Sequence, residues 1–183
     1  LYNMAVDEMI NNFEKDGTLR TGLLWGGVWT RDVSYSTILS MAYMQPQAAM
    51  TSLLCKINSK GEIVQDTGTG GAWPCSTDRQ IWVGAAGEIY KVTGSREWLE
   101  KVYPVAKKSL EVDIRTIYDE RTGLAKGESS FIDWRKNSYP LWMESADIYD
   151  SKCLGTNIVH YVALPSAAEM GRILGDTASA EIF

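Results

Sequence analysis

The sequence predicts an all-α protein that forms one domain over residues 1–183. Apolar residues recur at a spacing of three and four in six segments, which is the pattern of helices with one buried face. No stretch alternates convincingly between polar and apolar residues, as a half-buried strand would. The composition, 45% hydrophobic and 22% charged, is that of an ordinary globular domain long enough to bury a core.

The first three helices are predicted in the N-terminal third of the chain. The first covers about residues 2–15 and is stopped by Gly17. The second covers about residues 32–44. The third starts at Pro46, because proline is favoured in the first turn of a helix, and it continues toward Ile57.

Three further helices are predicted at residues 77–94, 95–117 and 157–174. A Thr-Asp pair opens the fourth as a cap residue and first-turn acid, and a glycine ends it. A serine caps the fifth. Pro104 is predicted to kink or break the fifth helix and Pro165 to bend the sixth, because proline lacks the amide hydrogen that a helix interior needs.

The connections between these helices alternate between long and short. The short ones are Met44-Gln45-Pro46, Thr93-Gly94-Ser95 and Gly175-Asp176-Thr177. The long ones, rich in glycine, tryptophan and polar residues, are residues 16–31, 58–77 and 119–156. Alternate connections between antiparallel helices emerge at opposite ends, so we expect the three long ones to share one end. Short hairpins are an open alternative inside the third.

An internal repeat supports a ring-like arrangement of helices. Residues 94–99 and 175–183 are weak copies of one another, about 80 residues apart. Two helix pairs and a long connection per repeat suit an α/α toroid of stacked hairpins.

Composition excludes several classes of function. The net charge of −5 disfavours nucleic acid as a partner, and no apolar run reaches the length of a membrane span. His160 is the single histidine and is expected to be a packed residue with its hydrogen bonds satisfied. With no CxxC pair present, Cys55, Cys75 and Cys153 are expected to be buried small hydrophobes, so neither a metal site nor a cofactor is predicted. The chain begins at Leu1, and its localisation is left open.

Tryptophan is unusually frequent. Trp82 and Trp98 fall within helix patterns and are expected in the core. The other five lie in the connections, where they can offer flat apolar surfaces to a ligand: Trp25, Trp29, Trp73, Trp134 and Trp142.

The first candidate site is Trp29-Thr30-Arg31-Asp32, at the entry to the second helix. A guanidinium and a carboxylate each make paired hydrogen bonds, which suit adjacent sugar hydroxyls, and an indole suits the C–H face of a pyranose ring. The alternative is an ion pair between Arg31 and Asp32 that caps the helix. Because the connections place Trp73, Asp78 and Asp133 at the same end, a sugar-binding corner is favoured.

The third long connection contains the candidate general acid, Asp133. Its aromatic neighbour Trp134 would raise the pKa of the carboxyl, as protonation of a leaving oxygen requires, whereas Arg135 would lower that pKa. The alternative is a structural loop acid. Other carboxylates in the connection are alternative acids: Glu128, and more weakly Glu144 with Asp147.

The second long connection is rich in glycine but lacks the Gly-Lys-Ser/Thr of a phosphate-binding loop. Its glycines would let the backbone approach a ligand, with Trp73 as a wall. Asp78, Arg79 and Gln80 would then point from a helix start toward the same ligand, and a simple helix cap is an equal alternative for Asp78. The chain has no DDxxD cluster, which counts against an all-helical isoprenoid cyclase.

Together these motifs resemble those of the six-hairpin (α/α)6-toroid glycoside hydrolases, such as glucoamylase, trehalase, processing α-glucosidase and glycogen-debranching-like proteins. The resemblance implies that Arg31 and Asp32 hold the sugar and that Asp133 is the general acid. It departs from the family in that the aspartate precedes the tryptophan. The residues implied to bind substrate are Trp29, Arg31, Asp32, Trp73, Asp78, Trp134 and Arg135.

The six predicted helices make up about half of such a ring, and no segment matches the family's catalytic base. We therefore predict part of an inverting glycoside hydrolase acting on an α-linked glucoside or related glycan, with the base outside this chain. The open flanks would pair with another copy or with a missing C-terminal half. The alternative function is a non-catalytic carbohydrate-binding or structural helical module. The resemblance slightly favours a periplasmic or secreted location.

Overall fold

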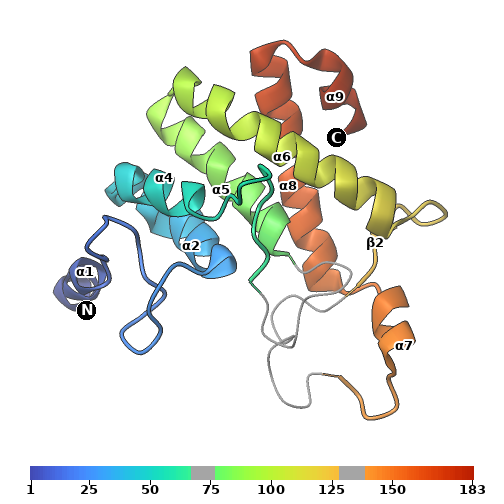
Figure 1. Ribbon diagram of the computed structural model, residues 1–183, viewed down its shortest axis with the longest axis horizontal. Helices are drawn as coiled ribbons and strands as arrows, with labels where there is room; N and C mark the ends of the chain where they lie inside the picture. Colours follow the sequence, from blue (N-terminus) through green and yellow to red (C-terminus); the bar gives the residue numbers. More distant parts are fainter. Residues whose placement is uncertain (67–76, 128–138) are drawn as a thin grey trace.

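The computed structural model describes residues 1–66, 77–127 and 139–183, and these are mostly helical (Figure 1), which confirms the all-α prediction. Strands within the described ranges are confined to one antiparallel hairpin of β1 (Tyr118–Asp119) and β2 (Leu124–Ala125). It lies where the third long connection begins, the connection in which a short hairpin was an open alternative. None of the helices in these ranges is long and apolar enough to cross a membrane.

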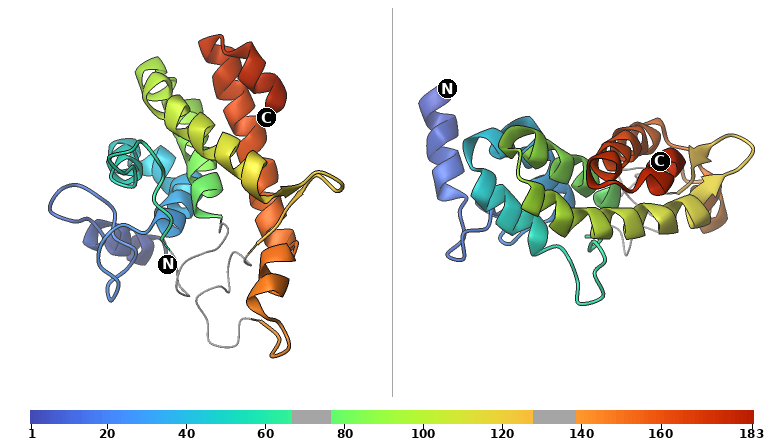
Figure 2. Two further views of the ribbon diagram at one scale, coloured as in Figure 1. Left: turned by 45° about the vertical axis from the view of Figure 1, so that its right-hand side comes forward. Right: turned by 90° about the horizontal axis from the view of Figure 1, so that it is seen from above.

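Helix α5 (Asp78–Thr93) is the centre of the fold. It lies between α2 (Thr30–Ser36) and α8 (Leu154–Leu174), as Figures 1 and 2 show, and it also packs against α4 (Pro46–Leu54) and α6 (Arg96–Ile117). Helix α2 continues through a π-helical turn at Thr37–Met41 into α3 (Ala42–Met44).

Small residues allow this close packing around α5. A Cβ added to Gly84 would lie 3.4 Å from Val162 of α8 and 3.6 Å from Ile38 of the π-helical turn. Trp82 and Trp98 are buried, as predicted, and their indole N–H groups donate to the carbonyl oxygens of Leu53 and Ala86, both at 2.9 Å. Each large side chain therefore satisfies its polar atom inside the core.

Several elements differ from the prediction. Helix α1 (Tyr2–Asn11) ends earlier than expected and has no buried residue, so little tertiary packing extends it. Helices α6 and α8 each continue through their prolines, Pro104 and Pro165, so of the kink or break expected at Pro104 the break is wrong. Each loses one backbone hydrogen bond to its proline, and burial of a long apolar face outweighs that loss.

Two shorter helices complete the fold. Helix α9 (Thr177–Ile182) starts after the predicted stop at Gly175, and the Asp176 side chain caps it by accepting from the Ser179 N–H at 3.2 Å. Helix α7 (Ser145–Asp150) was not predicted. It interrupts the third long connection and is too short for its apolar spacing to be read from sequence.

The prediction that the cysteines are buried is wrong for Cys55, which is exposed and follows α4, and Cys153 is half-buried. Cys75 lies outside the described residues. Cysteine burial depends on which face of a helix end meets the core, and the local sequence does not reveal that face.

The two ends of the fold have different roles. Two of the tight turns are neighbours, since the Arg96 guanidinium donates to the Ile173 carbonyl oxygen at 3.5 Å, between the start of α6 and the end of α8. At the other end, Arg31 of α2 pairs with Asp78 of α5, and Tyr118 after α6 bonds to His160 of α8. Segments flanking all three long connections thus meet at one end, as the alternation of connections predicted.

Candidate functional site

The starts of α2 and α5 meet through a buried ion pair. The Arg31 Nε lies 3.3 Å from an Asp78 carboxylate oxygen, and the Asp78 side chain is completely buried while that of Arg31 is 14% exposed. The whole second long connection lies between these residues in the sequence, which placed both at one end of the fold but did not predict that they pair with each other. The pair locks the two helix starts into one corner, which we call the α2–α5 corner.

Asp32 lies at the surface beside this pair. Partial desolvation by the surrounding protein raises the pKa of its carboxyl, the Arg31 charge opposes that rise, and the Asp66 charge adds to it. A surface carboxylate that is poorly solvated gains from a ligand that donates hydrogen bonds to it. Asp32 is therefore the group of the α2–α5 corner most suited to receive a hydroxyl donor.

Tyr35 joins the α2–α5 corner one helical turn after Arg31. Burial raises the pKa of its phenol, with the Arg31 cation lowering it and the Asp78 carboxylate raising it. The phenol therefore lies in the field of both members of the ion pair. We missed Tyr35 in the sequence, although its position four residues after Arg31 places it on the same helix face.

Two indoles form the outer edge of the α2–α5 corner. The ring centroids of Trp25 and Trp29 are 6.3 Å apart with an interplanar angle of 84°, an edge-to-face pair. Trp25 is 63% exposed and Trp29 is half-buried. Aromatic surface thus lies next to the charged groups that follow in α2.

The residues after Asp78 are directed elsewhere. The Arg79 guanidinium lies 3.4 Å from one carboxylate oxygen of Asp113 on α6, and the Gln80 amide donates to the other. Asp113 and Gln80 are buried. The expectation that Arg79 and Gln80 point toward a ligand is therefore wrong. A buried carboxylate needs cationic and amide partners. Asp113 of α6, 33 residues after Gln80, is such a carboxylate, and Arg79 and Gln80 are its partners.

His160 is buried, as predicted, but the described residues satisfy only one of its ring nitrogens. Its Nδ1 lies 2.9 Å from the Tyr118 hydroxyl, and its buried Nε2 has no hydrogen-bond partner in those parts of the chain. Burial lowers the pKa of the imidazole to about 4, and the Arg79 charge adds to the decrease. The ring is therefore neutral at pH 7.

The remaining candidate residues divide into two groups. Glu144 and Asp147 form the capping box of α7, in which the Asp147 carboxylate accepts from the Glu144 backbone N–H at 2.8 Å. The other group lies outside the described residues: Trp73, Glu128, Asp133, Trp134 and Arg135.

Across residues 1–66, 77–127 and 139–183, no cluster of three or more His, Cys, Asp or Glu side chains has the geometry to hold a metal ion. Comparison with known proteins finds no family model, no curated protein and no solved structure that matches the chain. The functional argument therefore depends on the chemistry of the α2–α5 corner.

Proposed function

We propose that this chain is part of a glycoside hydrolase acting on an α-linked glucoside or a related glycan, and that the α2–α5 corner binds the sugar. One observation carries the proposal: Arg31 and Asp78, from two motifs singled out in the sequence, form a buried ion pair beside an exposed carboxylate and an indole. Pairing between distant motifs supports a built site rather than two unrelated helix caps.

The chemistry of the α2–α5 corner suits a sugar. Asp32 accepts hydrogen bonds from hydroxyls, and a charged acceptor makes such bonds about twice as strong as neutral ones. The indole of Trp29 offers an apolar surface to the C–H face of the ring. Arg31 is held by its ion pair with Asp78, and because its guanidinium is partly exposed it can also donate a hydrogen bond to the sugar.

In the proposed reaction, Asp133 protonates the leaving oxygen as general acid, with Glu128 as the alternative acid. A base outside this chain activates the water that attacks from the opposite face, so the configuration is inverted. Trp73, Trp134 and Arg135 contribute further contacts to the sugar.

The second candidate is a non-catalytic carbohydrate-binding module. It is favoured by the capping box of α7, because Glu144 and Asp147, the weaker alternative acids, already bind the backbone there. Such a module would keep Trp29, Arg31 and Asp32 as a sugar-binding surface without using Asp133.

Calorimetry with maltotriose tests the proposed sugar binding, with cellotriose as the β-linked comparison. D32N should weaken maltotriose binding by about tenfold, because a hydrogen bond to a charged group contributes about 1.5–3 kcal/mol. The matched control is D7N, an exposed aspartate on α1, which should leave the affinity unchanged.

Hydrolysis of maltotriose by a longer form of the protein that supplies the base, as the wild type and as D133N, separates the two candidates, because this chain without the base is not expected to hydrolyse the sugar in either case. Binding together with hydrolysis that D133N abolishes supports the enzyme. Binding without hydrolysis favours the module, and full activity in D133N means that Asp133 is not the acid. Equal affinity of D32N and the wild type, or no binding by the wild type, overturns sugar binding at the α2–α5 corner.

A further inference from the structure

We propose that Lys56 and Asp66 are positioning residues for Trp29. They hydrogen-bond to the backbone of the residues before and after Trp29 and so hold it in place for the ligand. The proposal rests on the proposed sugar binding at the α2–α5 corner. We call this ion pair the Lys56–Asp66 clamp; its Nζ–Oδ2 distance is 2.8 Å. Lys56 belongs to no motif that the sequence analysis linked to function, and Asp66 lies in the second long connection without a role of its own.

Asp66 grips the backbone that follows Trp29. Trp29 occupies the N-cap position of α2 but makes no side-chain cap bond. Instead the Asp66 carboxylate accepts from the Thr30 N–H at 2.6 Å and lies 2.8 Å from the Thr30 hydroxyl. A carboxylate from another connection thus takes the role of the missing cap, where the helix dipole also favours negative charge.

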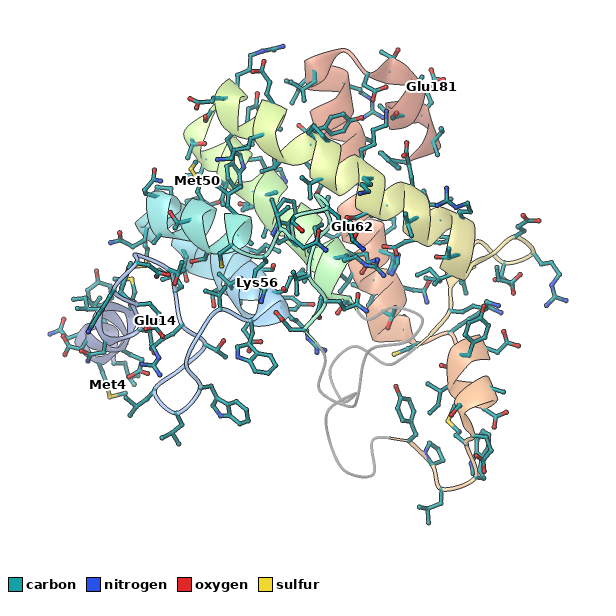
Figure 3. The ribbon with its side chains drawn as sticks, in the orientation of Figure 1. Met4, Glu14, Met50, Lys56, Glu62 and Glu181 are labelled. Carbon is teal, nitrogen blue, oxygen red and sulfur yellow. The ribbon has the colours of Figure 1, made fainter. Side chains whose placement is uncertain are left out.

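Lys56 grips the backbone that precedes Trp29. Its Nζ donates to the Val28 carbonyl oxygen at 2.8 Å and to the Asp66 carboxylate at 2.9 Å. Figure 3 labels Lys56, which comes just after α4 and lies beside the start of α2. The side chains of Lys56 and Asp66 are 12% and 19% exposed, so their bonds are largely protected from competing water.

The clamp is itself held in place by its own connection. Lys56 and Asp66 lie on the two arms of a short loop that the Val64 N–H closes by donating to the Lys56 carbonyl oxygen at 2.8 Å. An isolated bridge between Ile57 and Ile63 supports the same loop, and Ile63 is buried. The two gripping groups therefore have a fixed separation, which a positioning device requires.

A simple helix cap does not explain the whole arrangement. Capping α2 requires only the bond from Thr30 to Asp66. The bond from Lys56 to Val28 lies outside the helix and restrains only the residue before Trp29. The hydrogen bonds on the two sides together restrain the backbone of Trp29, and therefore the direction of the Cα–Cβ bond from which its indole extends.

The test is a double-mutant cycle on maltotriose affinity. K56M keeps the aliphatic part of the side chain and removes the bonds of the lysine to the Val28 carbonyl oxygen and to Asp66. W29A removes the indole that is to be positioned. K56M should weaken binding by about tenfold in the wild-type background and have no effect in the W29A background. D66N should behave in the same way. K60M, which alters an exposed lysine of the same loop, is the matched control and should change nothing.

Hydrogen exchange separates failure of the positioning from failure of sugar binding. K56M and D66N should each speed amide exchange in residues 28–33, whereas K60M should not. If the wild type does not bind maltotriose but exchange still rises, the proposed function fails and the backbone grip stands. Equal loss of affinity in the wild-type and W29A backgrounds, or unchanged exchange in both variants, overturns the proposal. Circular dichroism confirms folding, and if K56M does not fold, D66N decides.

Discussion

Replacing Arg31 with methionine tests whether the ion pair between α2 and α5 holds the α2–α5 corner together. The two partners are unequally buried, since Asp78 has no exposed side-chain surface and Arg31 still reaches solvent. R31M therefore leaves a carboxylate that water cannot reach, whereas D78N leaves a guanidinium at the edge of the solvent. We expect R31M to be the more damaging of the two.

The structure gives the size of the effect. At 3.3 Å and an effective dielectric constant of about 20, the two charges attract by about 5 kcal/mol. Removing one partner of a buried pair costs about 3–5 kcal/mol. We therefore expect R31M to lower the free energy of unfolding by about 4 kcal/mol and D78N by about 2 kcal/mol. The double variant R31M/D78N should be more stable than R31M alone, because it removes the buried charge of Asp78 together with the cation that faces it.

Urea unfolding followed by circular dichroism at pH 7 measures these differences. The matched control is E100Q, because Glu100 pairs with Arg96 at 2.9 Å on the surface of α6, with 63% of the Arg96 and 57% of the Glu100 side chain exposed, and this substitution keeps the bond from Arg96 to Ile173. Such a pair contributes about 0.3–0.5 kcal/mol. A cost for R31M no larger than that for E100Q, or additive effects in the double variant, would refute the reasoning.

Two further predictions concern pH. His160 has a pKa of about 4 in the folded state against 6.5 ordinarily, so the unfolded chain takes up the proton first as the pH falls. The free energy of unfolding should then drop by about 3 kcal/mol between pH 6.5 and 4, and urea titrations of H160Q should lack this component. Asp32 has a raised pKa, so its charged form destabilises the folded state above that pKa and has no such effect below its ordinary value of 3.8. D32N should therefore be more stable than the wild type at pH 7 and lose that advantage in acid, and a stability loss at pH 7 contradicts this.

Helices α5 and α6 could be predicted closely because their ends are marked by local chemistry. Gly94 ends α5 in a left-handed conformation with φ of 64°, which glycine adopts without strain. The Ser95 side chain caps α6 by accepting from the Trp98 N–H at 3.1 Å. These contacts join residues at most four apart in the sequence, so the sequence pattern contains them.

The expectations that failed depend on contacts that no local pattern contains. Pro104 and Pro165 would end an isolated helix, but α6 and α8 are long and each buries one face, so the prolines are tolerated. Cys55 was expected in the core, yet it follows the last turn of α4 and faces solvent. In each case the tertiary packing decided the outcome: burial keeps α6 and α8 continuous, and the core does not cover Cys55.

The candidate site shows the same division. The sequence indicated that Arg31 and Asp78 lie at one end of the fold, because the connections alternate in length. It did not indicate the contacts that hold the start of α2 in place. The hydrogen bond between Thr30 and Asp66, for example, spans 36 residues. Any of several carboxylates in the connections had the right chemistry for that role.

The sequence by itself determined the all-α class, the Ser95 cap of α6 and the end of the fold where the long connections meet, whereas the expected Thr77 side-chain cap of α5 is not made. These follow from periodicity and from capping bonds between near neighbours, both of which are local. Only the tertiary structure decided that Asp78 pairs with Arg31, that Asp113 takes Arg79 and Gln80, and that the Lys56–Asp66 clamp holds Trp29. Those pairings depend on which distant polar groups lose water together on folding, and burial, unlike periodicity, is a property of the assembled chain.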